Sequence, residues 1–441
     1  MKILFISYYF PPCGPGWAMR TVNFIRHFGQ LGWKNTVLTV KEKYYKENLT
    51  VDHGETLPEE LAEVVRTDSW EPSRPLNSPE ATADIRASAP ENTRGKRKSM
   101  GVKAGLVLKA TELIERFLLI PDVKILWFPQ AFRTGKKLIR EKDPDLLFAS
   151  LPVFSSGIIG WALKKATGKP LVIDFRDDWA ENPAYRHPYA WGRRLNSWYE
   201  RKVVEAADLV ILVTGWSVSE FTRRYPNQKA YLFLPNGYDP RLEKIKKRKK
   251  PSARLKKLRL VHSGYVALER DPSSFFEAAA QWLKEDPGLT ERFSVIFVGS
   301  VERRYLEMAG QLGLDDLFEF TGSLPYEENI RYLAGADAFL LLPSHNAPHS
   351  IPGKLYEYLY LGKPILAVSL PNASVDLLKE WNWGSVADPG DKKEIRDRLE
   401  ELLKRMERPG PEQRPDDRLI RSYSRADQAN RLAGRLKELR Q

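Results

Sequence analysis

Short apolar runs of strand length alternate with helix-like segments along this chain, and the alternation occurs twice. The first series contains the runs KILFISYYF, NTVLTV, DLLFAS, PLVIDF, DLVILV and AYLFLPNG. The second series contains LRLVHSG, FSVIFVGS, FEFTGS, AFLLLP and PILAV. Because the runs lack polar alternation, they are typical of parallel strands that are buried on both faces and joined by helical crossovers.

Chain length and one basic block predict where the domains begin and end. A chain of 441 residues exceeds the size at which one core stops growing, so we expect two domains. The block RLEKIKKRKKPSARLKK separates the two strand series and is typical of an exposed linker. We expect an N-terminal domain over 1–240 with a mobile insertion at about 69–99, a linker over 241–257, a C-terminal domain over 258–422 and a terminal helix over 423–441. The predicted fold class is α/β, with two Rossmann-like doubly wound domains facing each other across a cleft.

Composition narrows the possible partners. The single cysteine, Cys13, excludes an internal disulfide, and no Cys/His cluster has the spacing of a zinc site. No run approaches the roughly 20 apolar residues that span a bilayer. The net charge of +13 favours anionic partners such as nucleotide phosphates, anionic lipid or nucleic acid. The alternative is that these charges form a solvated surface with no partner. The segment from about 94 to 120 is basic and then amphipathic, so it is either a membrane-surface element or a helix packed on the sheet.

The most specific pattern is PSHNAPHSIPGKLYEYLYLGKPILAV, residues 343–368. A strand ends, a polar loop follows, and Pro352-Gly353 opens a helix whose free amides favour an anion such as a diphosphate. Lys354 adds a positive charge, and Glu357, four residues after Gly353, projects on the same helix face. A carboxylate at that position suits ribose hydroxyls. Taken singly, these residues have simpler explanations. Gly353 is compatible with a plain loop, and Lys354 and Glu357 are compatible with a solvated ion pair on a surface helix.

Together these residues resemble the donor loop of the family 4 (group 1) retaining glycosyltransferases, which have the GT-B architecture. In that family a Glu-x7-Glu motif spans the loop and helix, and its second glutamate, here Glu357, holds the donor ribose. The first position is His349 in this chain. The stretch from Ser350 through Leu355 to Tyr358 resembles a Ser-x-Pro-x-Lys-Leu-Tyr-Glu-Tyr variant of the motif. The resemblance implies that backbone amides of this loop hold the phosphate.

Two N-terminal segments extend the resemblance. FISYYFPPCGPGWAMR is similar to the family's first strand and glycine loop, where Gly14 and Gly16 would approach the sugar and acceptor, although an ordinary turn is an alternative. Arg20 either assists an anionic acceptor or is a surface charge. In LVIDFRDDW, Arg176 and Asp177 end a strand, and Asp177 is our candidate for orienting or deprotonating the acceptor hydroxyl. A helix cap by Asp177 or Asp178 is the alternative.

The segment LVHSGYVALERDPSS resembles the family's first donor-domain strand and loop. By that resemblance Gly264 approaches the donor and Arg270 neutralises the departing diphosphate. The alternative for Arg270 is an ion pair with Glu269 or Asp271. The segments LPNGYD, TGSLPYEEN and YSRADQANRLAGRLKEL are similar to the interdomain segment, the loop beside the base and the terminal helix that returns to the N-terminal domain.

The resemblance implies an enzyme of the hexosyltransferase type that moves a sugar from a nucleotide diphosphate to a hydroxyl with retention of configuration. We expect no metal and no cofactor, and a glycan or lipid-linked acceptor in cell-surface polysaccharide or glycolipid synthesis. The expected location is cytoplasmic, either free or peripheral on the inner face of the cell membrane. One alternative is a UDP-sugar 2-epimerase of the same architecture. Another is a nonenzymatic nucleic-acid-binding protein that uses the basic blocks near 94–98 and 244–257, although these lack interleaved aromatic residues. An NAD-dependent oxidoreductase is disfavoured because no G-x-G-x-x-G lies between a strand and a helix.

Overall fold

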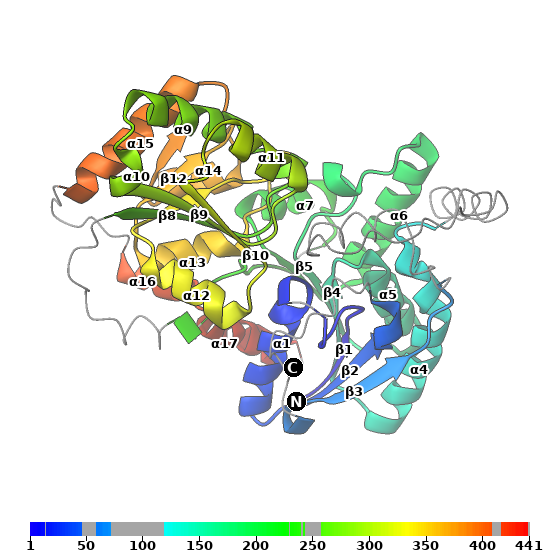
Figure 1. Cartoon of the computed structure of the whole chain (residues 1–441). Helices are drawn as coiled ribbons and strands as arrows, with labels where there is room; N and C mark the ends of the chain where they lie inside the picture. The colour runs from blue at the N-terminus through cyan, green and yellow to red at the C-terminus, as the bar shows by residue number, and fades with distance from the viewer. Residues whose placement is uncertain are drawn as a thin grey trace, which may run out of the picture. The chain divides into compact units, whose positions relative to one another are not determined.

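The computed structural model describes residues 1–13, 15–45, 59–71, 119–228, 230–239, 241–242, 257–407 and 416–439. The chain divides into two compact units (Figure 1). The N-terminal unit comprises Met1–Phe233 with Leu432–Gln441, and the C-terminal unit comprises Leu234–Arg431. Gly14, the stretch 94–118 and most of the predicted insertion and basic linker lie outside the described residues.

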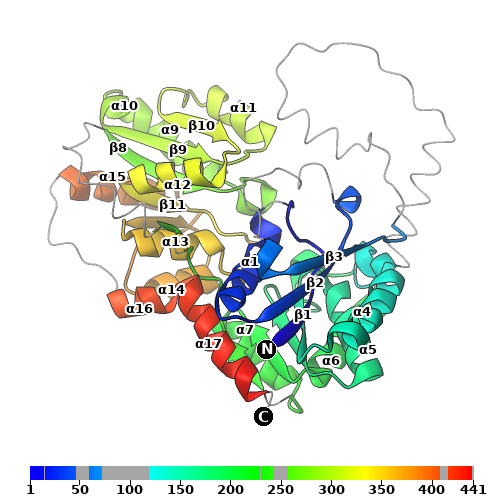
Figure 2. The same cartoon turned by 90° about the horizontal axis from the view of Figure 1, so that it is seen from below.

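The N-terminal unit is built on one parallel sheet of seven strands in the order β3-β2-β1-β4-β5-β6-β7. The strands are β1 (Lys2–Ile6), β2 (Lys34–Val40), β3 (Glu63–Thr67), β4 (Leu146–Leu151), β5 (Leu171–Phe175), β6 (Leu209–Leu212) and β7 (Tyr231–Phe233). The helices are α1 (Pro15–Gln30), α4 (Phe128–Lys142), α5 (Phe154–Thr167), α6 (Ala190–Ala206) and α7 (Gly215–Arg224), with 3-10 turns η1 (Glu42–Tyr44), η3 (Glu59–Leu61), η4 (Val123–Trp127) and η5 (Pro183–Tyr185). Figure 2 shows α1 on one side of the β1–β3 edge and α4 with α5 on the other.

The C-terminal unit contains a second parallel sheet, in the order β10-β9-β8-β11-β12-β13. Its strands are β8 (Leu258–Ser263), β9 (Phe293–Val298), β10 (Phe318–Gly322), β11 (Ala338–Leu341), β12 (Ile365–Val368) and β13 (Ser385–Ala387). Its helices are α9 (Ser273–Glu285), α10 (Leu289–Arg292), α11 (Arg303–Gln311), α12 (Tyr326–Gly335), α13 (Gly353–Leu361), α14 (Ala373–Glu380), α15 (Lys392–Glu407) and α16 (Asp417–Ser422), with one 3-10 turn η6 (Leu268–Arg270). The last helix, α17 (Arg425–Glu438), contains the point at which the chain returns to the N-terminal unit.

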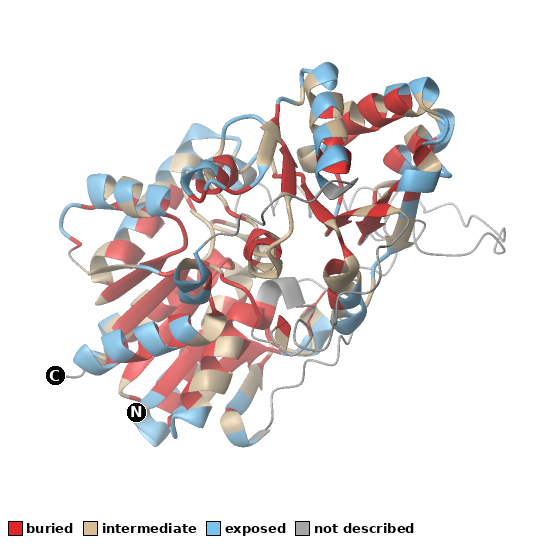
Figure 3. Ribbon diagram, turned by 90° about the vertical axis from the view of Figure 1, so that its left-hand side faces the viewer, coloured by how far each residue is buried: buried red, intermediate tan, exposed pale blue. Residues whose placement is uncertain are grey.

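Burial on both sheet faces explains the unbroken apolar runs. In β9, Val295 and Phe297 belong to one buried cluster, whereas Ile296 and Val298 belong to a second cluster on the opposite face. Successive side chains of a strand point to opposite faces, so helices must cover both faces of this sheet. Figure 3 shows the same arrangement as buried strands inside helices whose outer surfaces are exposed.

The predicted α/β class with two doubly wound sheets is confirmed. The apolar runs named from sequence each contain a strand, but two short strands were not anticipated. They are β3 and β13, at the edges of the two sheets. In β3, Glu63 and Val64 are exposed, so this edge strand lacks the continuous apolar run that marks a central one.

In each sheet the strand order reverses beside the first strand, between β1 and β4 and between β8 and β11. Loops after such a pair of parallel strands leave the sheet in opposite directions, which opens a crevice at the carboxyl ends of the strands. The fold therefore locates the candidate site of each unit at this reversal point. Within the described residues, no helix has the length and apolarity needed to cross a membrane.

Candidate functional site

Helix α13 begins at the reversal point of the C-terminal sheet. The chain leaves β11 at Leu341, passes through a polar loop and enters the helix at Gly353. Pro352 precedes the helix with φ −65° and ψ 139° and provides no side-chain cap, so the first amides of the helix have no such partner. A Cβ atom added at Gly353 would meet no atom within 4 Å. An uncapped helix start beside open space is suited to an anion.

Two glycines bring backbone against backbone at the end of β8. Gly264 has φ +122° and Gly299, which follows β9, has φ +134°, a region that strongly favours glycine. A Cβ atom on Gly299 would lie 2.5 Å from the carbonyl oxygen of Gly264. A Cβ atom on Gly264 would lie 3.1 Å from Nζ of Lys354. The loop after β8 therefore packs directly beside the first turn of α13.

A fully buried histidine holds Lys354 in this position. Nζ of Lys354 lies 3.2 Å from Nε2 of His262, whose Nδ1 lies 3.1 Å from the carbonyl oxygen of Leu340. Because a carbonyl only accepts, Nδ1 carries the ring proton and Nε2 accepts from the ammonium group. The His262 contact was not predicted from sequence, because nothing in a strand of apolar residues marks its pairing with a helix 92 positions later.

Positive charge is concentrated beside the helix start. Burial and the nearby Arg270 guanidinium lower the pKa of Lys354 well below its ordinary value. Burial and Lys354 likewise lower the pKa of His262, so the imidazole is neutral. Arg270 also pairs with Glu269 at 3.8 Å, which was the alternative expected for it. An arriving anion would relieve the repulsion between Lys354 and Arg270.

Glu357 lies one turn further along α13, among charged groups from distant segments. Burial raises the pKa of its carboxyl group, whereas Arg425 and Arg241 lower it and Asp239 raises it. Asp239 accepts from Nε and Nη2 of Arg241 at 3.1 and 2.7 Å, and pairs with Nη1 of Arg425 at 3.3 Å. These surroundings differ from the alternative interpretation of the sequence, in which Lys354 and Glu357 form a solvated pair on a surface helix. Asp239 and Arg425 lie in segments that resemble the family's, but nothing in those segments predicts that the two side chains meet.

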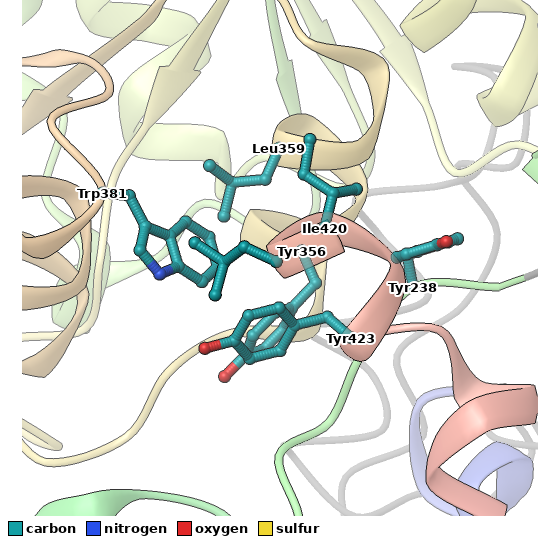
Figure 4. Close-up of a pocket in the computed structure, with 7 residues that line it drawn as sticks. Tyr238, Tyr356, Leu359, Trp381, Ile420 and Tyr423 are labelled. Atoms are coloured by element: carbon teal, nitrogen blue, oxygen red, sulfur yellow. The ribbon is translucent and has the colours of Figure 1, made fainter. Parts of the chain in front are cut away.

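Aromatic side chains fix the far side of α13 (Figure 4). Tyr356 lies 5.2 Å from Tyr423, whose ring lies 4.8 Å from Trp381, and Tyr238 stacks on Tyr360 at 4.2 Å. The side chains in Figure 4 enclose no volume that a water molecule could enter. The amide of Tyr238 donates to the carbonyl oxygen of Tyr423. This packing leaves the first turn of α13 little freedom to tilt.

The remaining predicted donor residues have different surroundings. Leu355 is fully buried in the core, and its amide donates to the carbonyl oxygen of Pro352, so it serves the helix instead of facing a ligand. Ser350 and His349 are half-buried in the loop before α13, and the Ser350 amide donates to Ala347. Of the predicted donor residues, the structure brings Gly264, Arg270 and Lys354 together.

In the N-terminal unit, Arg176 and Asp177 follow β5 at the carboxyl edge. The Arg176 guanidinium donates to the carbonyl oxygens of Leu151 and Pro152 at 2.9 and 2.8 Å, which ties the ends of β4 and β5 together. The Asp177 carboxylate accepts a hydrogen bond from the Tyr185 hydroxyl at 3.2 Å. Burial raises the Asp177 pKa, and Arg176 opposes this shift. A carboxylate with a raised pKa is better suited to accepting a proton than an ordinary surface aspartate.

Arg20 is not the surface charge that was its alternative reading. It is buried, and its Nε lies 3.1 Å from both carboxylate oxygens of the fully buried Asp174. Ser150 completes the group by donating to Asp174 at 3.3 Å. This pair joins α1 to β5, and an unpaired charge here would cost several kcal/mol. Gly16 lies in the first turn of α1, and Gly14 falls outside the described residues.

Two further carboxyl groups, those of Asp178 and Glu200, lie near Asp177. Burial, with smaller contributions from Glu200 and Asp177, raises the pKa of Asp178 to about 6. Glu200 is fully buried, pairs with Arg224 at 2.7 Å and accepts from the Ala180 amide at 2.6 Å. The described part of the chain gathers no group of three or more His, Cys, Asp or Glu side chains that could hold a metal ion.

The raised pKa of Asp178 makes stability depend on pH. The folded protein holds this proton up to about pH 6 and the unfolded chain only to about pH 4, so this contribution is complete below pH 4 and is lost as pH rises through 6. Asp178→Asn removes that loss. We expect the variant to gain about 2 to 3 kcal/mol relative to the wild type between pH 4 and 7. Urea unfolding at four pH values tests this prediction. It would be contradicted if the free energy of unfolding had the same dependence on pH in the variant and in the wild type.

Comparison with known protein families identifies both halves of the chain. Residues 16–237, half of the chain, match the family model described as the glycosyl transferase 4-like domain. Residues 243–413 match the family model described as glycosyl transferases group 1. The second match contains β8, Arg270 and the whole of α13.

Individual relatives agree with this assignment. A D-inositol 3-phosphate glycosyltransferase from Geodermatophilus obscurus is 25% identical over 185 residues, which span 39% of this chain and 40% of that protein. The structure of HepE from Anabaena, solved in complex with UDP, has a TM-score of 0.63 at 15% identity and covers 99% of this chain and 100% of that one. Sucrose-phosphate synthase from Thermosynechococcus elongatus has a TM-score of 0.61 at 14% identity, covering 100% of this chain and 99% of that one. The chain belongs to the group 1 glycosyltransferases and has their two-domain α/β fold of the GT-B type.

Proposed function

We propose that this protein transfers a sugar from a nucleotide diphosphate to an acceptor hydroxyl with retention of anomeric configuration. The observation that carries the proposal is the uncapped start of α13, with Lys354 held beside Gly264 and Glu357 one turn further along. We assign the reaction to the synthesis of a cell-surface polysaccharide or glycolipid, at the cytoplasmic face of the membrane. Family membership supports this assignment.

In this proposal the diphosphate lies against the Gly353 and Lys354 amides. Lys354 and Arg270 supply positive charge, and His262 keeps the Lys354 ammonium group directed toward Gly264. Glu357 accepts hydrogen bonds from the ribose. His349 and Ser350 lie in the preceding loop, where they are our candidates for contacting the sugar. The relative crystallised with UDP supports a nucleotide as the donor.

The leaving group is already stable, so the protein's main contribution is to orient both substrates and to stabilise charge that grows on the diphosphate. Two cationic side chains and a helix start supply that stabilisation here, and the proposed reaction requires neither a metal nor a cofactor. On the acceptor side, Asp177 orients or deprotonates the hydroxyl, with Arg176 limiting the rise in its pKa. Gly14 and Gly16 remain candidates for the sugar and acceptor loop.

The proposed Glu357–ribose contact predicts a specific loss in a thermal-shift screen. UDP, GDP, ADP, CMP and dTDP sugars are tested, and the cognate donor at 100 times its Kd stabilises the wild type by about 2.7 kcal/mol. Glu357→Ala abolishes this shift because the ribose loses its acceptor. As a control, removal of the ribose hydroxyls from the nucleotide lowers the thermal shift of the wild type, because the same contact is then lost from the ligand side. A full shift in Glu357→Ala would overturn the assigned contact.

His262 is predicted to act on the diphosphate only through Lys354. His262→Phe preserves a buried ring but removes the acceptor that holds the ammonium group, so affinity for inorganic pyrophosphate falls about tenfold, equivalent to one hydrogen bond to a charged group. Lys354→Met lowers the affinity at least as far. The double variant binds no more weakly than Lys354→Met alone, as titration calorimetry will measure. Additive losses would show that His262 acts by another route.

The reaction itself is tested by following the cognate donor with and without an acceptor. Transfer with retention gives a product with the same anomeric configuration as the donor, which coupling constants in proton NMR report. We expect turnover to depend on the acceptor and Asp177→Asn to lower kcat by at least a hundredfold, as loss of a general base does. Conversion of a UDP-sugar to its 2-epimer without any acceptor would instead support the epimerase.

A further inference from the structure

Outside the site, one exposed face of α6 and the loop before it carry large aromatic side chains. Trp191 and Trp198 lie seven residues apart on this helix and are 46% and 45% exposed. Tyr185 and Tyr189 in the preceding loop are 37% and 36% exposed. We call this set the aromatic face, together with the exposed residues Arg186, Arg194 and Arg201.

Packing of α6 explains why these rings remain outside. The opposite face of the helix is buried through Gly192, Asn196, Glu200, Val203 and Val204. Glu200 is fixed by Arg224 and by the Ala180 amide, so the helix cannot roll to bury its tryptophans. Among the described residues outside α6, the ring partner of Trp198 is Trp161 from α5, which it meets edge-on with ring centroids 6.0 Å apart. Large rings held outward by a fixed helix mark an interaction surface.

The charges on the aromatic face are mostly positive. Arg186, Arg194 and Arg201 are exposed, and the acid on the same helix face, Glu205, pairs with Arg201 at 3.4 Å. Tryptophan and tyrosine prefer the boundary between lipid and water, and arginine is attracted to anionic headgroups. A single-stranded nucleic acid would instead be expected in a groove that stacks successive bases. A helix whose outer side carries both residue types suits a flat, negatively charged surface.

The aromatic face is also linked to the candidate acceptor site. The loop that carries it leaves the carboxyl edge of the sheet after β5, and the Tyr185 hydroxyl donates to the Asp177 carboxylate at 3.2 Å. The Tyr185 ring packs edge-on against Phe154 at 5.0 Å. A surface bound through this loop would therefore lie near the group that we assign to the acceptor hydroxyl.

We propose that the aromatic face, Tyr185 to Arg201, docks this protein on an anionic lipid bilayer so that a lipid-linked acceptor reaches Asp177. The proposal rests on the proposed function for the identity of the acceptor, whereas the docking itself does not require a donor or turnover. It assigns the membrane contact to residues other than those of 94–120, for which a membrane-surface element was one of two interpretations of the sequence. The rings enter the headgroup region, and the arginines pair with lipid phosphates.

The test is co-sedimentation of the full chain with vesicles of phosphatidylcholine alone or mixed with phosphatidylglycerol. The wild type binds the anionic vesicles and is released by high salt. Trp191→Ser with Trp198→Ser lowers the partition coefficient at least tenfold, and Arg186→Glu with Arg194→Glu lowers it only on anionic vesicles. Trp70→Ser is the matched control, because Trp70 is 62% exposed and follows β3 at the far edge of the sheet. Circular dichroism confirms that each variant is folded.

Three results would overturn the proposal. In the first, the wild type does not bind the anionic vesicles. In the second, the double tryptophan variant binds the vesicles as well as the wild type does. In the third, that variant retains vesicle binding but loses self-association or binding to single-stranded DNA. Nucleotide thermal shifts measured on the same variants separate this failure from failure of the proposed function. If docking alone is wrong, the nucleotide shifts persist; if the donor site is wrong, they are absent while vesicle binding remains.

Discussion

The backbone amides of Gly353 and Lys354 at the start of α13, where Pro352 provides no side-chain cap, are the constraint on which the candidate donor site depends. A parallel sheet whose order reverses between β8 and β11 sends the two following loops apart, and α13 starts where they separate. Capping by a side chain would satisfy these amides internally, but Pro352 has no group that could do so. The aromatic packing around Tyr356 and Tyr423 then fixes the direction in which the helix points.

Charges around this helix start are arranged at a cost to the free protein. Lys354 is placed beside Arg270 and against the backbone of Gly264, where burial lowers its pKa, and the neutral His262 accepts a hydrogen bond from it. Like charges brought together in a partly buried site favour the binding of an anion that compensates them. Glu357 has the opposite balance, since burial raises its pKa while Arg425 and Arg241 favour its ionised form.

Sequence patterns predicted the sheets and the helix start because both arise from local rules. Apolar runs without polar alternation marked the buried strands, and Pro352-Gly353 followed by Gly362 marked the ends of α13, with Gly362 adopting φ +67° at its C-terminus. Contacts between distant segments could not be predicted in this way. His262 faces Lys354, and Asp239 meets Arg425, only because the sheet and α16 bring these segments together. The motif resemblance predicted that Leu355 contacts the donor, whereas the helix periodicity of α13 directs its side chain into the core.

The most direct test of the account is a crystal structure of the protein with its cognate nucleoside diphosphate. The account predicts that phosphate oxygens lie within hydrogen-bonding distance of the Gly353 and Lys354 amides, that the Lys354 ammonium contacts the same group, and that a Glu357 carboxylate oxygen contacts the ribose. A diphosphate bound at another edge of the sheet, with the first turn of α13 unoccupied, would contradict it.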